Sequence, residues 1–209
     1  MIITVDGPVA AGKGTLARRL ARHFDFAYLD TGSLYRAAAL KLLQAGKDLG
    51  DAGAAAAAAA AVVAADLAEP RLRDEDVGEA ASRVAARAEV RGVFLDFQRR
   101  FARSPPDGRA GAVLDGRDIG TVVCPDADVK FFVTAAVEAR ARRRHDELRR
   151  RGEQVSYAQV LAELKRRDDR DRARAASPLR PAADAHLLDT TNLDIEAAFR
   201  AALAIIAAR

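Results

Sequence analysis

The sequence predicts an α/β protein in which helices cover both faces of a central parallel sheet of five strands, a three-layer arrangement. Short apolar runs recur at residues 2–5, 27–29, 112–114, 129–133 and 186–188, and a stretch with helical periodicity follows each run. Strands that alternate with helices form parallel sheets. The chain has 209 residues, 50% of them apolar, which is enough for one such domain with a small insertion but not for a second full domain.

The first strand runs into a glycine-rich loop and then into a helix. The loop and first turn read Gly7-Pro8-Val9-Ala10-Ala11-Gly12-Lys13-Gly14-Thr15. Backbone N–H groups of such a loop bind phosphate oxygens, and the lysine adds a positive charge at the β and γ phosphates. We therefore expect residues 7–15 to bind a polyphosphate, with Lys13 at its β and γ phosphates and the Thr15 hydroxyl on the side of Mg²⁺. The alternative is a glycine turn without a ligand.

The second strand ends at Asp30-Thr31-Gly32-Ser33-Leu34-Tyr35-Arg36, where a helix begins. Ligands of α/β proteins collect at this edge of the sheet. We expect Thr31 to cap the helix and Arg36, one turn later, to reach a phosphate. A cap followed by a surface arginine is the alternative.

Residues 46–79 form an inserted, mostly helical piece, because residues 52–65 are nearly all alanine and valine. After it, an apolar stripe predicts a helix that packs on the sheet. The stripe consists of Val90, Val93, Phe94, Phe97 and Phe101.

The third strand leads into Asp115-Gly116-Arg117-Asp118. A carboxylate that ends a central strand opposite a phosphate loop holds Mg²⁺, usually through water, so we assign Asp115 to the metal. Arg117 would then point at the transferred phosphate. A solvated turn is the alternative.

Two arginine-rich helices come next, joined by a turn near Gly152. The first carries Arg140, Arg143 and Arg144, and a capping box at Ser156 and Gln159 opens the second. Such a pair fits a mobile lid that closes over phosphates. Arg167, Asp171 and Arg174 follow at helical spacing and share one face, where they suit phosphate and sugar contacts. Exposed helices with local ion pairs are the alternative for this whole region.

The amino-acid composition limits the kinds of binding partner that we expect. The net charge is +4 with a pI near 9.6, and only three Tyr, eight Phe and no Trp are available for base stacking, so we expect no nucleic-acid partner. Cys124 is the only cysteine, which excludes an internal disulfide. No apolar run is long enough to span a membrane. Because a strand begins at Ile2 with no basic n-region or apolar h-region before it, we expect no targeting segment. We expect a cytoplasmic monomer with no membrane partner.

Four motifs together resemble the bacterial cytidylate kinases, a family of P-loop nucleoside monophosphate kinases. In chain order they are Asp6-Gly7-Pro8 with Gly12-Lys13-Gly14-Thr15, Asp30 to Arg36, Asp115-Gly116-Arg117-Asp118-Ile119-Gly120-Thr121-Val122-Val123, and Arg167-Asp168-Asp169-Arg170-Asp171-Arg172. The resemblance covers nearly the whole chain. It implies one P-loop kinase domain over 1–209, with a core at 1–45, 89–139 and 180–209, a helical monophosphate-binding insertion at 46–88 and a short arginine-rich lid at 140–175.

The resemblance also implies the reaction, the transfer of the γ-phosphoryl group of ATP to CMP or dCMP with Mg²⁺. By motif match, phosphate contacts fall on Arg36, Arg117 and Arg174, and pentose contacts on Arg167 and Asp171. The base would meet Ser82 and Arg91, and Asp118 would take the cytosine amino group. Catalytic roles fall on Lys13, Arg117, Arg174, Arg140 and Arg144, and Thr31 joins the substrate-binding set.

The insertion departs from the larger family members, which carry a hairpin-like insert with several strands where this chain has a shorter run dominated by residues 54–61. Two other functions are compatible with the phosphate-binding loop. One is a P-loop kinase for UMP, AMP or a metabolite, and the other is a protein that only senses ATP. Asp118 and the Arg-Asp run argue against the first, and the absence of an Asn-Lys-x-Asp guanine motif together with the few aromatic residues argues against the second.

Overall fold

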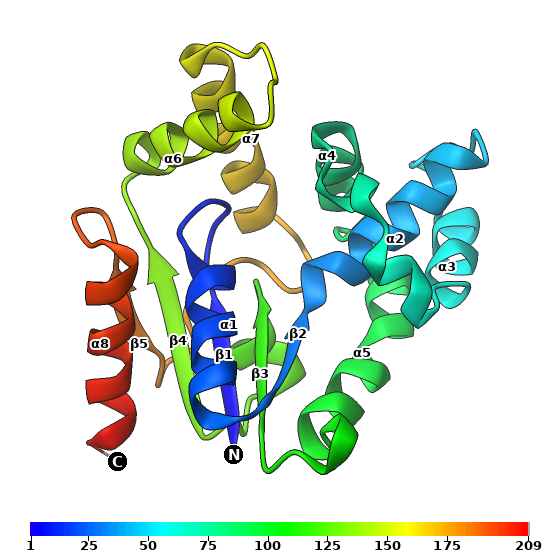
Figure 1. Ribbon diagram of the computed structural model, residues 1–209. Coiled ribbons are helices and arrows are strands. Elements are labelled where there is room, and N and C mark those ends of the chain that lie inside the picture. Colours follow the sequence, from blue (N-terminus) through cyan, green and yellow to red (C-terminus); the bar gives the residue numbers. More distant parts are fainter. Residues whose placement is uncertain (209) are drawn as a thin grey trace.

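A five-stranded parallel sheet forms the centre of the computed structural model, which describes residues 1–208 (Figure 1). Its order is β2-β3-β1-β4-β5, and every neighbouring pair is parallel. The strands are β1 (Ile2–Asp6), β2 (Ala27–Asp30), β3 (Ala112–Gly116), β4 (Val129–Thr134) and β5 (His186–Asp189). This confirms the five predicted strands and their parallel arrangement.

Eight helices surround the sheet: α1 (Lys13–Phe24), α2 (Thr31–Gln44), α3 (Ala52–Ala60), α4 (Glu75–Val84), α5 (Ala88–Arg103), α6 (Val137–Arg150), α7 (Tyr157–Arg172) and α8 (Ile195–Ala207). Short 3₁₀ turns occupy Ala64–Ala68, Pro70–Arg73 and Pro106–Gly108, and a π-helical turn spans Ile119–Val123. None of the helices within residues 1–208 is long and apolar enough to cross a membrane.

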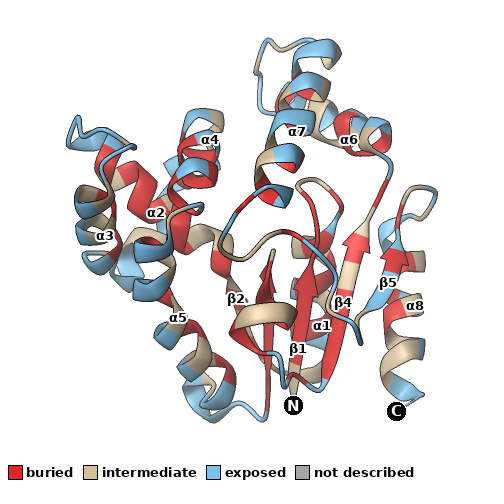
Figure 2. Cartoon of the chain, turned by 180° about the vertical axis from the view of Figure 1, so that it is seen from behind, coloured by how far each residue is buried: buried red, intermediate tan, exposed pale blue. Residues whose placement is uncertain are grey.

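Alternate residues of β3 point to the two faces of the sheet, which gives the three layers. Val113 packs with α1 and α8 on one face, whereas Ala112 and Leu114 pack with the end of α5 and the π-helical turn on the other. The inner strands β1, β3 and β4 are buried along most of their length, whereas the edge strand β5 is largely exposed (Figure 2). Both faces of the sheet are therefore covered, as expected for parallel strands.

The stripe predicted for α5 is wrong in part. Val90 and Phe94 are buried, but they pack with α2 and α3, where the Phe94 ring meets the Tyr35 ring edge-on at 5.1 Å. Val93 and Phe97 are 38% and 39% exposed. The helix leaves the sheet to cover the insertion, so only its C-terminal half follows the predicted contact.

Of the two helix caps predicted from the sequence, that of α7 is confirmed and that of α2 is wrong. Ser156 and Gln159 form the predicted capping box of α7, and the Asp194 side chain accepts the N–H of Ala197 at the start of α8. Thr31 does not cap α2: it is the first helical residue, and its hydroxyl donates to the Asp115 carbonyl at 2.8 Å. Thr31 thus joins β2 to β3.

Helices α6 and α7 stand above the carboxyl end of the sheet, whereas α3 and α4 lie to its side, beyond β2 (Figure 1). Helices α6 and α7 form a hairpin, with a small apolar cluster of its own that includes Leu148 and Leu164. Helices α3 and α4, with the short turns between them, form the insertion, which packs on α2. The insertion is helical, as predicted. The hairpin and α4 flank the edge at which the glycine-rich loop lies.

Candidate active site

Two cavities open at the carboxyl edge of the sheet and share Ala10 and Lys13 in their walls. The larger, of about 880 Å³, extends over the start of α1 toward α6 and α8, and we call it the donor cavity. The smaller, of about 200 Å³, lies between the sheet edge, α4 and α7, and we call it the acceptor cavity. A molecule in one cavity would therefore meet a molecule in the other at Lys13.

The loop between β1 and α1 depends on glycine at two positions. Gly7 has φ +146°, and a Cβ there would lie 1.9 Å from the Val133 carbonyl oxygen, so a side chain does not fit. Gly12 caps α1 with φ +92°, in the left-handed region that favours glycine. These two glycines let the loop turn tightly and aim its N–H groups, with the helix N-terminus, at the donor cavity.

Lys13 is the charged group at the junction. Its ammonium donates to the Pro8 carbonyl at 3.3 Å and lies 3.8 Å from the Asp115 carboxylate. Burial, with Arg117 nearby, lowers the pKa of Lys13 to about 8. An anion entering here would raise this pKa toward its ordinary value, because an opposite charge favours the protonated amine.

Asp115 lies against the first turn of α1: a Cβ on Gly14 would come within 2.9 Å of its Oδ2. Burial raises the pKa of Asp115, and Tyr28 donates to its Oδ2 at 3.3 Å. Residues 1–208 contain no group of three or more His, Cys, Asp or Glu side chains suited to a metal. One carboxylate beside a phosphate loop nevertheless fits Mg²⁺, which keeps several waters and binds largely through substrate phosphates. Thr15 lines the donor cavity on the same side.

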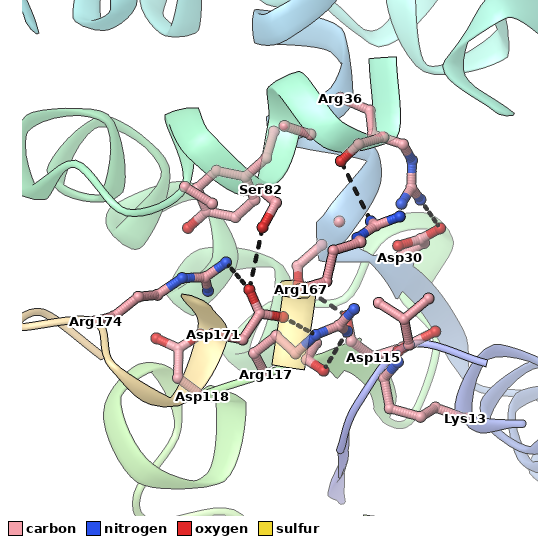
Figure 3. A pocket seen from close by; sticks show the side chains of 18 of the residues that line it. Lys13, Asp30, Arg36, Ser82, Asp115, Arg117, Asp118, Arg167, Asp171 and Arg174 are labelled. Atoms are coloured by element: carbon pink, nitrogen blue, oxygen red, sulfur yellow. Dashed lines mark hydrogen bonds and ion pairs between the residues drawn. The ribbon is translucent and has the colours of Figure 1, made fainter. Parts of the chain in front are cut away.

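Every residue that the sequence assigned to the acceptor lines the acceptor cavity: Thr31, Arg36, Ser82, Arg91, Arg117, Asp118, Arg167, Asp171 and Arg174. They come from α2, α4, α5, the turn after β3, α7 and the segment behind it. Arg174 lies past the end of α7, which stops at Arg172, so it reaches the cavity from a turn and not from the predicted helix face. These segments, far apart in the sequence, converge here (Figure 3).

Asp171 is the centre of the polar network in this cavity (Figure 3). It accepts hydrogen bonds from Ser82 Oγ at 3.3 Å and from Arg117 Nε at 3.1 Å. It also forms a salt bridge with the Arg174 guanidinium, which donates to its Oδ1. Burial opposes its charge, yet Arg117 and Arg174 hold the pKa of Asp171 below its ordinary value. A fixed carboxylate thus orients two arginines that a phosphate could also use.

Arg91 and Asp118 form a second pair, buried between α5 and the turn after β3. Arg91 also donates to the Ala85 carbonyl at 3.0 Å, and its guanidinium lies 5.4 Å from the centre of the Tyr35 ring. Asp118 is 4% exposed. The pair presents donors and an acceptor beside an aromatic ring, which suits the edge of a flat polar heterocycle.

The sequence that forms this site also matches a known protein family. The family model described as cytidylate kinase matches residues 3–208. The chain belongs to the cytidylate kinase family. Proteins named cytidylate kinase from Methylocella silvestris, Methylobacterium sp. and Paramagnetospirillum magneticum are 61%, 60% and 56% identical to it, over 99%, 100% and 100% of this chain and 94%, 98% and 98% of theirs.

A solved structure shares the fold. An uncharacterized protein from Eubacterium ventriosum is similar with a TM-score of 0.56 over 100% of this chain and 99% of that one, at 15% identity. This likeness concerns the fold alone. The match to the cytidylate kinase family rests on the sequence comparisons, which extend through both cavities.

Two arginines of the α6–α7 hairpin in this cytidylate kinase family member lie in different surroundings. Arg144 lines the donor cavity and pairs with Glu75 and Glu147. Arg140, which the sequence assigned to catalysis, lines neither cavity: it is 3% exposed and binds Asp168 at 2.6 and 3.1 Å. The hydrophobic side of α6 carries Arg140 inward, where only a carboxylate satisfies its charge.

Sequence reasoning left out several cavity residues. Asp30 and Tyr35 line the acceptor cavity, and Asp30 binds Arg36 at 2.7 Å. Arg18 and Arg19 line the donor cavity, as does Arg143, which the sequence had placed only in the lid. Asp30 was detectable, because it ends a strand at the ligand edge of the sheet. The arginines were not, since basic residues of an amphipathic helix are more often solvated.

Proposed function

We propose that this chain transfers the γ-phosphoryl group of ATP to CMP or dCMP, giving CDP or dCDP and ADP. The observation that carries the proposal is the meeting of two cavities at Lys13, one over a phosphate loop and the other lined by arginines and a buried Asp118–Arg91 pair. The names of relatives up to 61% identical agree with it.

ATP would occupy the donor cavity with its phosphates on residues 7–15. Lys13 would contact the β and γ phosphates, and Arg144 would approach from α6, exchanging Glu75 for phosphate. Thr15 and Asp115 would hold Mg²⁺, Asp115 through water. When bound, this ion neutralises charge on the β and γ phosphates and fixes their geometry.

CMP would occupy the acceptor cavity. Arg36, Arg117 and Arg174 would bind its phosphate, because paired guanidinium groups match phosphate oxygens in geometry and charge. Arg167 and Asp171 would bind the pentose. Ser82, Arg91 and Asp118 would bind the base. A carboxylate at Asp118 accepts from the 4-amino group of cytosine, whereas uracil presents a carbonyl oxygen there and would be repelled.

The reaction needs no covalent intermediate on the protein. An oxygen of the CMP phosphate attacks the γ phosphorus in line, and the bond to the β–γ bridging oxygen breaks to release ADP. The protein positions the two phosphates and neutralises their charge. The α6–α7 hairpin would move over the phosphates and exclude water, with the buried Arg140–Asp168 pair tying its two helices together.

Initial rates of ADP formation from Mg-ATP test this proposal, with CMP, dCMP, UMP, AMP and no acceptor as the five conditions. We expect rapid ADP formation with CMP and dCMP, and rates at least about 100-fold lower with UMP and AMP. Equal rates with and without an acceptor would instead show a nucleotide-hydrolysing sensor. We further propose that the protein acts as a cytoplasmic monomer on small molecules alone, for which sedimentation with and without nucleotides is the check.

A further inference from the structure

Asp6 ends β1, the central strand, and lies outside the set of predicted site residues. It is 4% exposed and stands opposite Gly116 of β3 in the sheet register. Its carboxylate accepts two backbone hydrogen bonds from another part of the chain, from the N–H of Ile119 at 2.9 Å and from the N–H of Gly120 at 2.7 Å. Each oxygen takes one donor, so both oxygens are used.

The two donors open the π-helical turn Ile119–Val123, which directly follows Arg117 and Asp118. The first N–H groups of any helical turn lack partners inside it and need an acceptor from elsewhere. The preceding Asp118, at the cap position, makes no side-chain cap of this kind. Asp6 supplies the missing acceptor from the neighbouring strand.

Packing leaves this turn little freedom to shift. A Cβ on Gly120 would lie 3.0 Å from Thr4 Oγ1 and 3.4 Å from Asp6 Oδ2, so the turn sits directly against β1. A Cβ on Gly116 would lie 2.6 Å from Ile119 and 2.7 Å from Thr31 Oγ1. Both ends of the segment 116–120 are therefore fitted closely, and Asp6 provides its polar anchor.

The segment held in this way carries two of the acceptor-cavity groups. Arg117 donates to the Gly116 carbonyl at 3.1 Å and to Asp171, and Asp118 binds Arg91. We propose that Asp6 is a positioning residue for the acceptor: it fixes segment 116–120 so that Arg117 and Asp118 face the phosphate and base of the bound monophosphate. This inference rests on the proposed function, since it assigns Asp6 to the selection of that substrate.

Asp6→Asn tests the inference in the full chain. An amide keeps the size of the side chain but replaces one acceptor by an NH₂ donor, so one of the two backbone bonds is lost. Asp128→Asn is the matched control, because Asp128 accepts the Ile2 N–H at 2.7 Å at the other end of the same strand. The measurements are KM and kcat for CMP, UMP and ATP.

For Asp6→Asn we expect the KM for CMP to rise about tenfold or more and the ratio of kcat/KM for CMP over UMP to fall severalfold. The KM for ATP should stay within about twofold, and Asp128→Asn should behave as the wild type. A merely structural role would raise both KM values together and leave the CMP-to-UMP ratio unchanged. That result would overturn the inference.

Asp6→Glu and amide exchange keep the test decisive if Asp6→Asn does not fold. Glu keeps the charge but moves it by one methylene group, so the same selective loss for CMP is expected. In the wild type the Gly120 amide should exchange slowly with solvent; exchange as fast as in an exposed loop would contradict the contact. A wild type that fails to phosphorylate CMP would reject the proposed function instead, because the exchange measurement does not depend on activity.

Discussion

Lys13, at the start of α1, lies where the two cavities meet, and Arg117, in the turn after β3, lines the acceptor cavity close enough to lower the pKa of Lys13. We expect Lys13→Ala and Arg117→Ala each to lower kcat/KM by about 100-fold or more, because each removes a charge that the transferred phosphoryl group requires. Steady-state kinetics with CMP and Mg-ATP measure this effect. The fold should survive both changes.

Lys47→Ala and Arg22→Ala are the matched controls for these variants, since both residues are exposed and line neither cavity. Their activity should equal that of the wild type. Near-normal turnover in Lys13→Ala or Arg117→Ala would remove that residue from the catalytic set.

Asp6 gives a pH dependence of stability with a definite sign. Burial raises its pKa from 3.8 to about 7 in the folded protein. Between these two values the folded protein binds more protons at this site than the unfolded chain does, so its contribution to the unfolding free energy falls as pH rises, by at most about 1.4 kcal/mol per pH unit. Above about pH 7 the contribution is constant.

Urea unfolding of the wild type and Asp6→Asn between pH 4.5 and 8 measures this contribution as a difference. As pH rises to about 7, the unfolding free energy of the wild type should fall relative to that of the variant. Above about pH 7 the difference between the two should stay constant. Parallel curves across the whole range would show that Asp6 carries no raised pKa.

At the scale of elements, the α6–α7 hairpin depends on one buried ion pair. Arg140 and Asp168 are 3% exposed each and bind through two contacts. Asp168→Asn should lower the unfolding free energy by about 3 kcal/mol, because it leaves a buried guanidinium without its counter-charge. Thermal or urea unfolding measures the loss.

Asp169→Asn is the neighbouring control, since the Asp169 side chain is 81% exposed and its contact with Arg172 is at the 4.0 Å limit. It should change stability by less than about 0.5 kcal/mol. Equal stabilities of the Asp168 and Asp169 variants would contradict a structural role for the Arg140 pair.

The elements also show where sequence patterns lose information. Strand positions and the Ser156 cap follow from local chemistry, and both were predictable. The partners of α5 and of Arg140 were not predictable. An apolar stripe indicates that a helix face can be buried, but neither the stripe nor an arginine indicates which neighbour will cover it. Val93 and Phe97 fit the helical period, yet the helix turns them outward.

At the scale of the whole molecule, the sheet order explains why the acceptor-cavity residues were predictable as a set. Strands β3 and β1 are neighbours at the centre, so the motifs that follow them meet at one edge. The contacts within the set were not predictable. Asp171 lies 54 residues from Arg117 and 89 from Ser82, and only the fold brings them together.

The selection of cytosine in the acceptor cavity is the central claim, and competition between acceptors tests it most directly. With equimolar CMP, UMP and isotope-labelled AMP and limiting Mg-ATP, the ratio of the diphosphate products reports the ratio of kcat/KM values without separate rate constants. We predict CDP as the main product, about 100-fold over UDP and labelled ADP. UDP or labelled ADP in equal or greater amount would contradict the assignment of the Asp118–Arg91 pair to the base and of this chain to CMP.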